Sequence, residues 1–588
     1  MNASARVRSA ACTDGGGGGA RLATSVKRPE AIAAGLLVAA ALAVRCVAAH
    51  YFQVDTDEPQ HLHVVWGWVH GLVQYRDLFD NHAPLFHLLC APLLGIVGEH
   101  PGSLAALRIA LTPVALGEAA VIGWLGSRLF SPRAGLWGAV FSLVLPPQAL
   151  ATLQFRPDGL WSLLWLATLA TWVGGPPRSA RSFAAGLLLG AGVCVSVKTA
   201  FMLAALGLAG GLTWLGHSER EISRASARSL LPHALVAALG ALVVPAVVAG
   251  FFASQDALGP LVRDAVAHNL LPGLGLWGQE RLRPWLFPLS LPLVWLAARL
   301  VATDAPNGAV AAGRAFVISA GLFYAAVLYC GSPLVDSESW QPVLPLAALF
   351  AAALLVGDVA GPRRLEAWLR ARSSPVVGAA CLQLVLLGLA PGFRNSGMQE
   401  YEALVERVLT LTAPQDTVAD VKGETSFRPR GLSYVLEIVT RTRLQRGLLP
   451  DDIPEQLVRH RTSVAVLDVG RFPPRAREFL KRNFVGAGAV GVAGRYLTQS
   501  QEPQSEILFE IEIPGPYRVV SPLGPVPGWL DGLPIAGPRE LAAGPHVFRG
   551  DPAHRKLAQL AVVWAPAIER GFSPFAQDPA TALAIAGR

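Results

Sequence analysis

The chain has 588 residues, of which 52% are hydrophobic and only 15% charged, and its formal net charge is +8. A soluble protein of this length needs more charge to cover its surface, so most of the apolar residues must face lipid. The basic residues lie scattered in short loops and form no patch with interleaved aromatic residues, which argues against a nucleic-acid partner. The six cysteines show no C-x-x-C spacing, so neither a disulfide framework nor a zinc site is expected.

The first 30 residues are basic and rich in glycine, and we expect a disordered cytoplasmic tail over 1–30. The apolar block 31–49 follows. It could be a cleaved signal peptide, but the leader before it is too long, and further apolar blocks follow. An uncleaved first membrane helix is therefore favoured.

Ten further apolar blocks approach the length of about 20 residues that a helix needs to cross a bilayer. They lie at 102–126, 135–151, 159–174, 182–197, 199–216, 231–252, 285–300, 315–331, 341–357 and 374–391. The segment 84–98 is apolar but short, and we expect a re-entrant or interfacial helix there. The sequence therefore predicts an α-helical polytopic membrane protein with about eleven spans over 31–391.

The distribution of Lys and Arg predicts the orientation. With the N-terminus placed in the cytoplasm, the loops on that side carry threefold more Lys and Arg than the loops on the other side. Cytoplasmic loops of membrane proteins carry this excess. An odd number of spans then places everything after residue 391 outside the cytoplasm.

The last third of the chain has a different pattern. Strand-like runs at 463–469 and 490–497, with a helical segment around 475–484 between them, predict an extracytoplasmic α/β domain over 392–502. After it, short alternating strands such as 507–513, separated by Pro-Gly turns, predict a β-sandwich domain over 503–588.

Three clusters of polar residues fall at the external ends of predicted spans, where charged side chains are costly to place. They are Asp55, Asp57, Glu58, His61 and His82 in the first external loop, Arg156 and Asp158 in the second, and Lys198 in the third. Each could merely solvate a loop, and Lys198 could extend to the interface as a surface lysine does. Three such clusters on one side of a chain poor in charge favour a functional site instead.

Metal binding is an alternative for the first loop. Asp55, Asp57, His61 and His63 offer oxygen and nitrogen ligands, but their spacing matches no established metal motif. We assign no metal ligand, and a divalent metal cofactor stays an open alternative.

The order of these motifs resembles the GT-C superfamily of membrane glycosyltransferases, and more narrowly its bacterial polyprenyl-phosphate-dependent mannosyltransferase and aminoarabinose transferase group. The resemblance covers roughly 30–400 and rests on an acidic pair after the first helix, His-Ala-Pro-Leu from His82, Arg-Pro-Asp from Arg156, and Lys198 followed by Thr. The chain departs from the family at Ala83, where a first proline is common. It also departs at 339–342, Ser-Trp-Gln-Pro, where many members show Arg-Tyr, so no donor contact is transferred to that loop.

The resemblance implies a glycosyltransferase of the bacterial inner membrane with a GT-C-like fold. It would move a sugar from a polyprenyl-phosphate donor to a hydroxyl of a glycan, lipid or protein acceptor outside the cytoplasm, by one inverting displacement. A lipid donor also fits the predicted topology, because nucleotide sugars are made in the cytoplasm.

The predicted chemistry needs a base and a cation. We assign the general base to Asp57 with Glu58 as its nearest substitute, and orientation of acceptor or sugar to Asp158. Lys198, with His82 and Arg156, would hold the leaving phosphate. The same expectation includes two further substrate-binding residues, His61 and Asp55.

A membrane transporter or flippase for a lipid-linked saccharide is the main alternative, since Glu118 lies inside a predicted span. The polar residues nevertheless gather at one face, and no internal repeat is visible, whereas transporters bind substrate near the midplane of repeated halves. A third hypothesis is a non-catalytic surface module on a membrane anchor.

Overall fold

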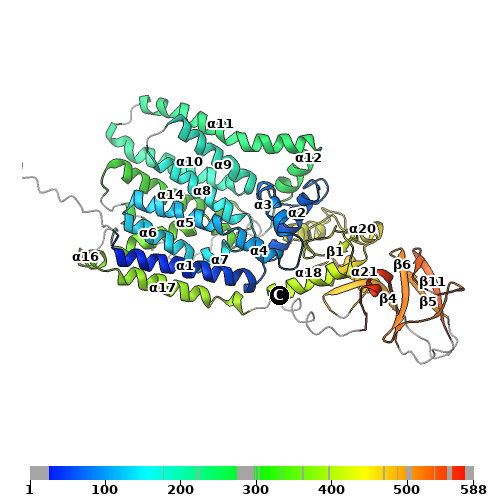
Figure 1. Cartoon of the computed structure of the whole chain (residues 1–588). Helices are drawn as coiled ribbons and strands as arrows, with labels where there is room; N and C mark the ends of the chain where they lie inside the picture. Colours follow the sequence, from blue (N-terminus) through cyan, green and yellow to red (C-terminus); the bar gives the residue numbers. More distant parts are fainter. Residues whose placement is uncertain are drawn as a thin grey trace, which may run out of the picture.

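The computed structural model shows a bundle of long helices with a C-terminal unit of short helices and strands at one end (Figure 1). The described residues are 26–175, 178–221, 224–274, 297, 299–301, 305–332, 334–359, 363–394, 397–467, 470–486, 488–497, 506–535, 537–551 and 559–575. Most of the predicted tail 1–30 and of the predicted span 285–300 lies outside these residues.

The helical bundle follows the predicted apolar blocks. Its helices are α1 (Arg28–Tyr51), α4 (Ser103–Ala110), α5 (Thr112–Leu129), α6 (Pro132–Val144), α7 (Pro146–Ala151), α8 (Asp158–Val173), α9 (Ser179–Val195), α10 (Thr199–Glu221), α11 (Arg224–Ser254), α14 (Gly308–Gly331), α15 (Leu344–Leu355) and α17 (Ser374–Gly388). The predicted span 135–151 is broken into α6 and α7, because Leu145 precedes Pro146 and is extended, with ψ 114°. Proline disfavours the helical conformation in the residue before it.

The predicted count of eleven spans is not confirmed. Within the described part of the chain, four helical stretches are long and apolar enough to cross a membrane: Arg28–Tyr51, Ser103–Leu129, Leu231–Ser254 and Gly308–Gly331. A pair bent by 71°, Arg364–Ala371 with Ser374–Gly388, would make a fifth. Other apolar helices, such as α15 with 12 residues, are shorter than the roughly 17 residues that a spanning helix needs.

Small residues let the bundle helices approach closely. A Cβ atom on Gly126 of α5 would lie 2.7 Å from the Cα atom of Gly135 in α6. A Cβ atom on Gly186 of α9 would lie 1.9 Å from the carbonyl oxygen of Ala237 in α11. Close backbone contact of this kind is typical of helices that associate in lipid, where the hydrophobic effect gives no drive for association.

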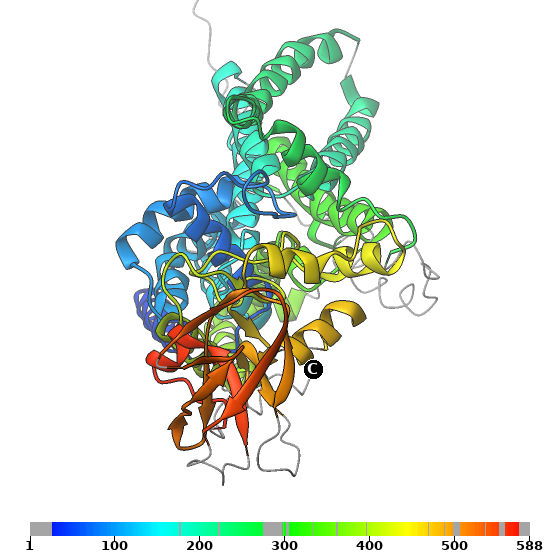
Figure 2. The ribbon, with the colours of Figure 1, turned by 90° about the vertical axis from the view of Figure 1, so that its right-hand side faces the viewer.

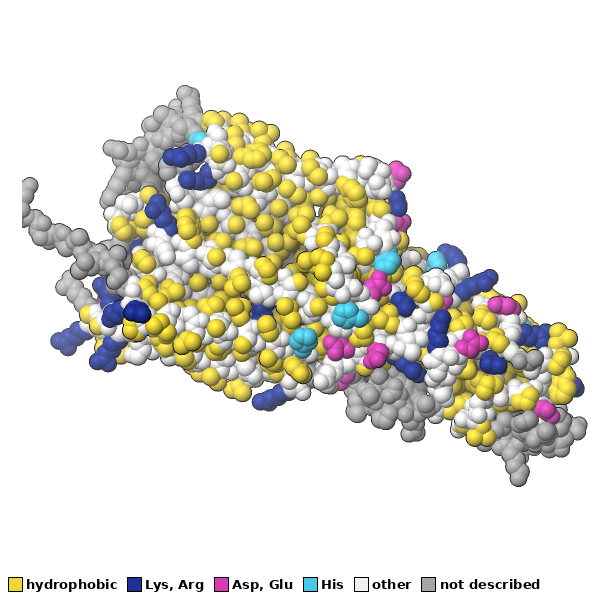
Figure 3. All heavy atoms as spheres, viewed as in Figure 1, with side chains coloured by type: hydrophobic (Ala, Val, Ile, Leu, Met, Phe, Trp, Pro, Cys, Tyr) yellow, Lys and Arg dark blue, Asp and Glu magenta, His cyan; other side chains and the backbone are white. Residues whose placement is uncertain are grey.

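The two ends of the bundle differ. The N-terminal end of α1 and the helix α16 (Arg363–Ala371) lie at the end away from the C-terminal unit (Figure 1), where Figure 3 shows Lys and Arg side chains beside a broad hydrophobic face. The positive-inside rule predicts that this is the cytoplasmic end. There, buried Glu30 accepts hydrogen bonds from Arg133 Nε at 2.7 Å and Trp137 Nε1 at 2.6 Å, which fixes α1 against α6.

Short elements cover the opposite end of the bundle, next to the C-terminal unit. They are α2 (Asp57–Val69), α3 (Leu85–Val97), α12 (Leu258–Leu261), the π-helix η1 (Val262–Ala267) and the 3-10 helices η3 (Glu338–Trp340) and η4 (Pro391–Phe393). The short helix α3 matches the non-spanning apolar helix expected over 84–98.

The C-terminal unit mixes helices and strands. Its elements are α18 (Gly397–Leu411), β1 (Val418–Ala419), α19 (Ile438–Gln445), α20 (Ile453–Arg459), β2 (Val464–Val466), α21 (Pro474–Asn483), β3 (Phe484–Val485), β4 (Val490–Leu497), β5 (Ile507–Ile511), β6 (Gly515–Ser521), β7 (Gly524–Pro525), β8 (Gly528–Leu530), β9 (Leu533–Pro534), β10 (Arg539–Leu541), β11 (Gly544–Gly550), β12 (Leu560–Trp564) and α22 (Ala565–Glu569). The helix α21 and the strands β2, β4 and β5 lie where the sequence predicts them.

One sheet runs through both segments that the sequence analysis separates at residue 502. Its strand order is β1-β2-β4-β12-β6-β10, and β12, from the end of the described chain, pairs antiparallel with both β4 and β6. A second sheet has the order β5-β11-β8-β9. One hydrophobic core extends from Leu404 to Phe572. The division into an α/β domain and a β-sandwich domain stays a prediction.

The C-terminal unit is fixed to the short elements at the end of the bundle (Figures 1 and 2). The His268 ring, after η1, lies 2.9 Å from Glu437 Oε1 at the start of α19. Arg443 of α19 donates hydrogen bonds to the carbonyl oxygens of Ala267 and His268. The unit therefore lies directly against the loops that carry the predicted site residues.

Candidate active site

The loop after α1, which the sequence predicts to be external, places Asp57 at the start of α2. Its backbone N–H donates to Asp55 Oδ1 at 2.9 Å, so Asp55 caps the turn that leads into the helix. Asp57 and Glu58 occupy the first turn of α2, where the exposed N–H groups of a helix favour negative charge. The side chains of Asp55 and Asp57 are partly accessible, with exposed fractions of 28% and 20%.

Glu58 has a different environment from its neighbour. Its side chain is fully buried and forms a paired salt bridge with Arg108, with Arg108 Nε at 2.8 Å from Oε1 and Nη2 at 2.5 Å from Oε2. Its carboxylate also accepts the backbone N–H groups of Asp55 and Phe155. All of these contacts are structural, and Glu58 is not placed to substitute for Asp57 as a base.

Arg156 brings the first two predicted clusters together. It lies just before α8, and its guanidinium contacts Asp55 at 2.5 Å, Asp57 at 2.8 Å and Asp158 at 3.1 Å. Burial alone would lower the pKa of Arg156, but the charges of Asp158 and Asp55 outweigh it and raise that pKa above its usual value. Arg156 is thus a permanent cation at the centre of three carboxylates.

Lys422 also reaches this cluster, and sequence reasoning missed it. It follows β1 in the C-terminal unit, and its Nζ contacts Asp57 Oδ1 directly. It lies 365 residues from Asp57 and belongs to no motif of the membrane part. The run Asp-Val-Lys-Gly-Glu after a short strand was the one available signal, and it resembles many polar turns.

Lys198, in the turn between α9 and α10, contacts the loop after α14. Its Nζ donates to Ser339 Oγ at 2.8 Å and lies 3.3 Å from Asp336 Oδ1. Burial would raise the pKa of Asp336, but the charge of Lys198 and the hydrogen bond from Ser339 outweigh it and lower that pKa to about 2. Arg156 contributes to the same lowering, so the Lys198 pair lies within electrostatic range of the carboxylate cluster.

The predicted histidines lie in a buried polar network beside the cluster. His82 Nδ1 is 3.0 Å from Asp80 Oδ1, and its side chain remains 25% exposed. His61 is fully buried, with Nδ1 2.9 Å from His87 Nε2, and burial lowers its pKa well below the usual value. His82 is therefore accessible to a ligand, whereas His61 is buried and connects the loop to His87.

Among the described residues, no group of three or more His, Cys, Asp and Glu side chains is arranged to hold a metal ion. The metal alternative for the first loop thus stays a hypothesis.

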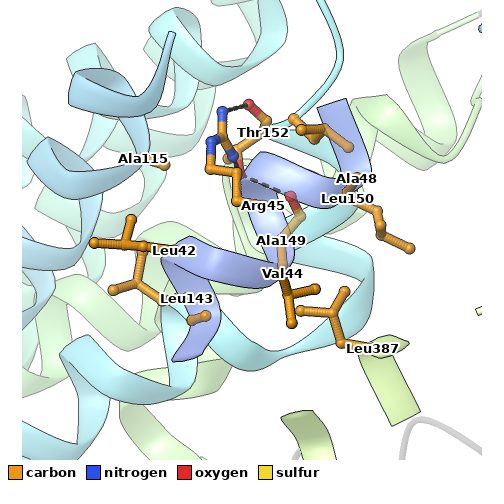
Figure 4. A pocket seen from close by; sticks show the side chains of 12 residues that line it. Leu42, Val44, Arg45, Ala48, Ala115, Leu143, Ala149, Leu150, Thr152 and Leu387 are labelled. Carbon is orange, nitrogen blue, oxygen red and sulfur yellow. Dashed lines mark hydrogen bonds between the residues drawn. The ribbon is translucent and has the colours of Figure 1, made fainter. Parts of the chain in front are cut away.

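A small pocket between α1, α5, α6, α7 and α17 does not form part of this site (Figure 4). Arg45 is its charged lining residue, and it donates to Thr152 Oγ1 at 3.2 Å and to the Thr152 carbonyl oxygen at 2.6 Å. The other lining side chains labelled in Figure 4 are almost all apolar. Arg45 therefore joins α1 to the end of α7.

No family model matches the chain, and no curated protein matches it either. Solved structures do. The crystal structure of ArnT from Cupriavidus metallidurans in the apo state matches with a TM-score of 0.53 and 14% sequence identity, covering 78% of this chain and 97% of that chain. The same protein bound to undecaprenyl phosphate gives a TM-score of 0.54 at 14% identity with the same coverage. The apo oligosaccharyltransferase of Archaeoglobus fulgidus gives a TM-score of 0.44 at 12% identity, covering 84% of this chain and 73% of that chain.

The match to ArnT extends over almost the whole of that protein. At this level of identity the likeness concerns the fold. The chain accordingly shares the fold of ArnT, in agreement with the fold that its resemblance to the GT-C superfamily implied.

Proposed function

We propose that the chain is a membrane glycosyltransferase that moves a sugar from a polyprenyl-phosphate donor to an acceptor hydroxyl outside the cytoplasm. The observation that carries the proposal is the convergence of Asp55, Asp57 and Asp158 on Arg156. These carboxylates come from two separate external loops, and they meet where the bundle adjoins the C-terminal unit.

The partial exposure of Asp57 supports its role as general base. As the acceptor oxygen bonds to the anomeric carbon, Asp57 takes the hydroxyl proton. The bond between that carbon and the phosphate oxygen breaks, and the polyprenyl phosphate leaves with the electron pair. One such displacement inverts the configuration at the anomeric carbon. Asp158, whose side chain is only 9% exposed, is better placed to orient a substrate than to exchange protons.

A cation near the membrane surface would stabilise the leaving phosphate. Lys198 is 26% exposed and follows α9 directly, so a phosphate on a lipid anchored in the bilayer could approach it. His82 and Arg156 would assist. The shared fold supports a lipid donor, because ArnT has been solved bound to undecaprenyl phosphate. The acceptor would be a glycan, lipid or protein at the outer face of a bacterial inner membrane.

The transporter alternative depends on Glu118, and its environment gives that alternative little support. Glu118 is buried in α5, and Gln148 Nε2 donates a hydrogen bond to its Oε2 at 2.5 Å. The residue thereby joins α5 to α7.

Transfer of labelled sugar from a polyprenyl-phosphate donor tests the proposal. Asp57→Asn preserves the shape of the side chain but cannot accept the proton, so we expect turnover to fall by about 10²–10⁴-fold with donor binding retained. Asp256→Asn is a matched control, because Asp256 is an exposed acid next to Gln255, whose carbonyl oxygen accepts a hydrogen bond from Arg76 in the loop that carries Asp57. Its φ of 54° is one that asparagine tolerates. Near-normal turnover in Asp57→Asn would refute the assignment of the base. Repeating the assay with a chelator tests the metal alternative.

A further inference from the structure

The turn that follows β1 carries a buried lysine into the candidate active site. The side chain of Lys422 is only 9% exposed, and its Nζ contacts Asp57 and lies 3.3 Å from Thr56 Oγ1. Removing an ammonium group from water is unfavourable by several kcal/mol unless a partner compensates. The contact with Asp57 therefore compensates the burial of Lys422 and is part of the folded structure, unlike an exposed surface ion pair.

The turn itself is rigidly organised around Asp420. Its carboxylate accepts hydrogen bonds from the backbone N–H groups of Gly423 at 2.9 Å and Thr425 at 3.0 Å, and from the Thr425 hydroxyl. Arg430 Nε donates to the same carboxylate at 2.7 Å. These bonds hold the backbone on both sides of Lys422 in one conformation and thereby fix the direction of its side chain.

The same turn is pressed against α2, the helix that begins with Asp57. Gly423 has a positive φ of 87°, and a Cβ atom there would lie 3.1 Å from His63 Cβ and 3.3 Å from the carbonyl oxygen of Pro59. His63 Nδ1 in turn lies 2.9 Å from the carbonyl oxygen of Ser426. Glycine is thus required both for the backbone conformation and for the close approach.

We propose that Lys422 is a positioning residue through which the C-terminal unit holds the Asp57 carboxylate in place and in its charged form for transfer. This inference rests on the proposed function. Lys422 contacts Oδ1 of Asp57, and Arg156 contacts Oδ2, so cations from two distant parts of the chain fix the carboxylate from both sides. A carboxylate has about four acceptor sites, so each oxygen retains room for the acceptor hydroxyl.

The charged groups around Asp57 set the expected pH dependence. Arg156 and Lys422 favour the carboxylate form, and Asp55 opposes it. Glu437, Arg471 and Glu424 act more remotely, through Lys422. An opposite charge within contact distance shifts the protonation of a carboxylate by about 1–3 pH units. Lys422→Met removes one of the two cations. We therefore expect the acid limb of the pH profile of kcat/KM, where activity falls as Asp57 is protonated, to move toward higher pH by about one unit or more.

The pH profile of sugar transfer by the full-length protein tests the inference. Lys422→Arg retains the charge and should keep the wild-type acid limb, with lower turnover because the longer, planar group shifts the carboxylate. Lys481→Met, at an exposed lysine of α21, is the matched control and should leave profile and turnover unchanged. If Lys422→Met does not fold, Lys422→Gln is the replacement, since it retains a hydrogen-bond donor without the charge.

Two outcomes overturn the inference. An acid limb that stays in place in Lys422→Met, with turnover either normal or reduced in proportion to the folded protein, would show that the lysine only holds the turn. A raised KM for the donor with an unmoved acid limb would make Lys422 a phosphate ligand instead. Either result leaves the proposed function intact if Asp57→Asn is inactive, whereas an active Asp57→Asn overturns the proposed function as well.

Discussion

Exchanging Glu58 for glutamine should mainly damage the fold, whereas exchanging its neighbour Asp57 for asparagine should mainly damage the chemistry. Glu58 is fully buried, and its two oxygens accept four hydrogen bonds: two from Arg108 and one each from the backbone N–H groups of Asp55 and Phe155. An amide offers one oxygen and one NH2 group in their place. The NH2 group must then face a donor, and Arg108 loses its counter-charge.

The magnitude follows from these contacts. Arg108 is itself fully buried, and in the described part of the chain its remaining partners are the backbone carbonyl oxygens of Ala49, Phe52 and Gln53, which carry no charge. Breaking a buried ion pair by removing one partner typically destabilises a protein by about 3–5 kcal/mol. The exposed acid Glu99, 3.1 Å from His70, is the matched control, and surface pairs contribute about 0–1 kcal/mol.

Thermal unfolding in detergent, followed by the loss of monodisperse protein on size exclusion, measures the effect. We expect Glu58→Gln to lower the unfolding midpoint clearly, with residual activity in proportion to the folded fraction. Glu99→Gln should unfold at the wild-type temperature. Asp57→Asn removes a partner of Lys422 and Arg156, but Asp57 is 20% exposed, so its midpoint should fall less than that of Glu58→Gln. A Glu58→Gln protein that is as stable as wild type yet inactive would refute the structural role and place Glu58 in the chemistry.

Three further predictions concern the donor site, pH and the C-terminal unit. Lys198→Ala should weaken donor binding as well as turnover, measured by lipid binding and transfer assays, because the phosphate is charged before and after transfer. Burial lowers the pKa of His63 and of His87 to about 4, whereas in the unfolded chain such rings titrate near 6.5. The unfolded state then binds more protons between these values, so stability should fall from pH 6.5 toward 4, and His63→Gln should flatten that dependence in thermal unfolding. Truncation after residue 502 removes β12 and leaves β4 without that partner. It should therefore increase proteolysis of the whole unit from α18 onward, and a truncated protein as resistant as full length would contradict this.

Part of the site could be predicted because the membrane sorts loops to its two sides. Alternate loops emerge on the same face. Asp57, Arg156 and Lys198 follow the first, third and fifth predicted spans, which was enough to predict that they share that face. The structure confirms that Asp55, Asp57, Arg156 and Asp158 meet. The span count is not confirmed for a local reason: the break at Leu145 and short helices such as α15 are invisible to a measure of average apolar length.

The amino-acid sequence alone determined that this is a helical membrane protein with a mixed α/β C-terminal part, since apolar block length and strand periodicity are local properties. Only the tertiary structure decided which of two adjacent acids is available for chemistry. Successive residues on a helix point about 100° apart, so Asp57 faces the Arg156 cluster while Glu58 turns inward to Arg108. The same holds for Lys422 and for β12, which reach their partners across long stretches of chain. Such contacts depend on how distant elements pack, and no local pattern of residues encodes that packing.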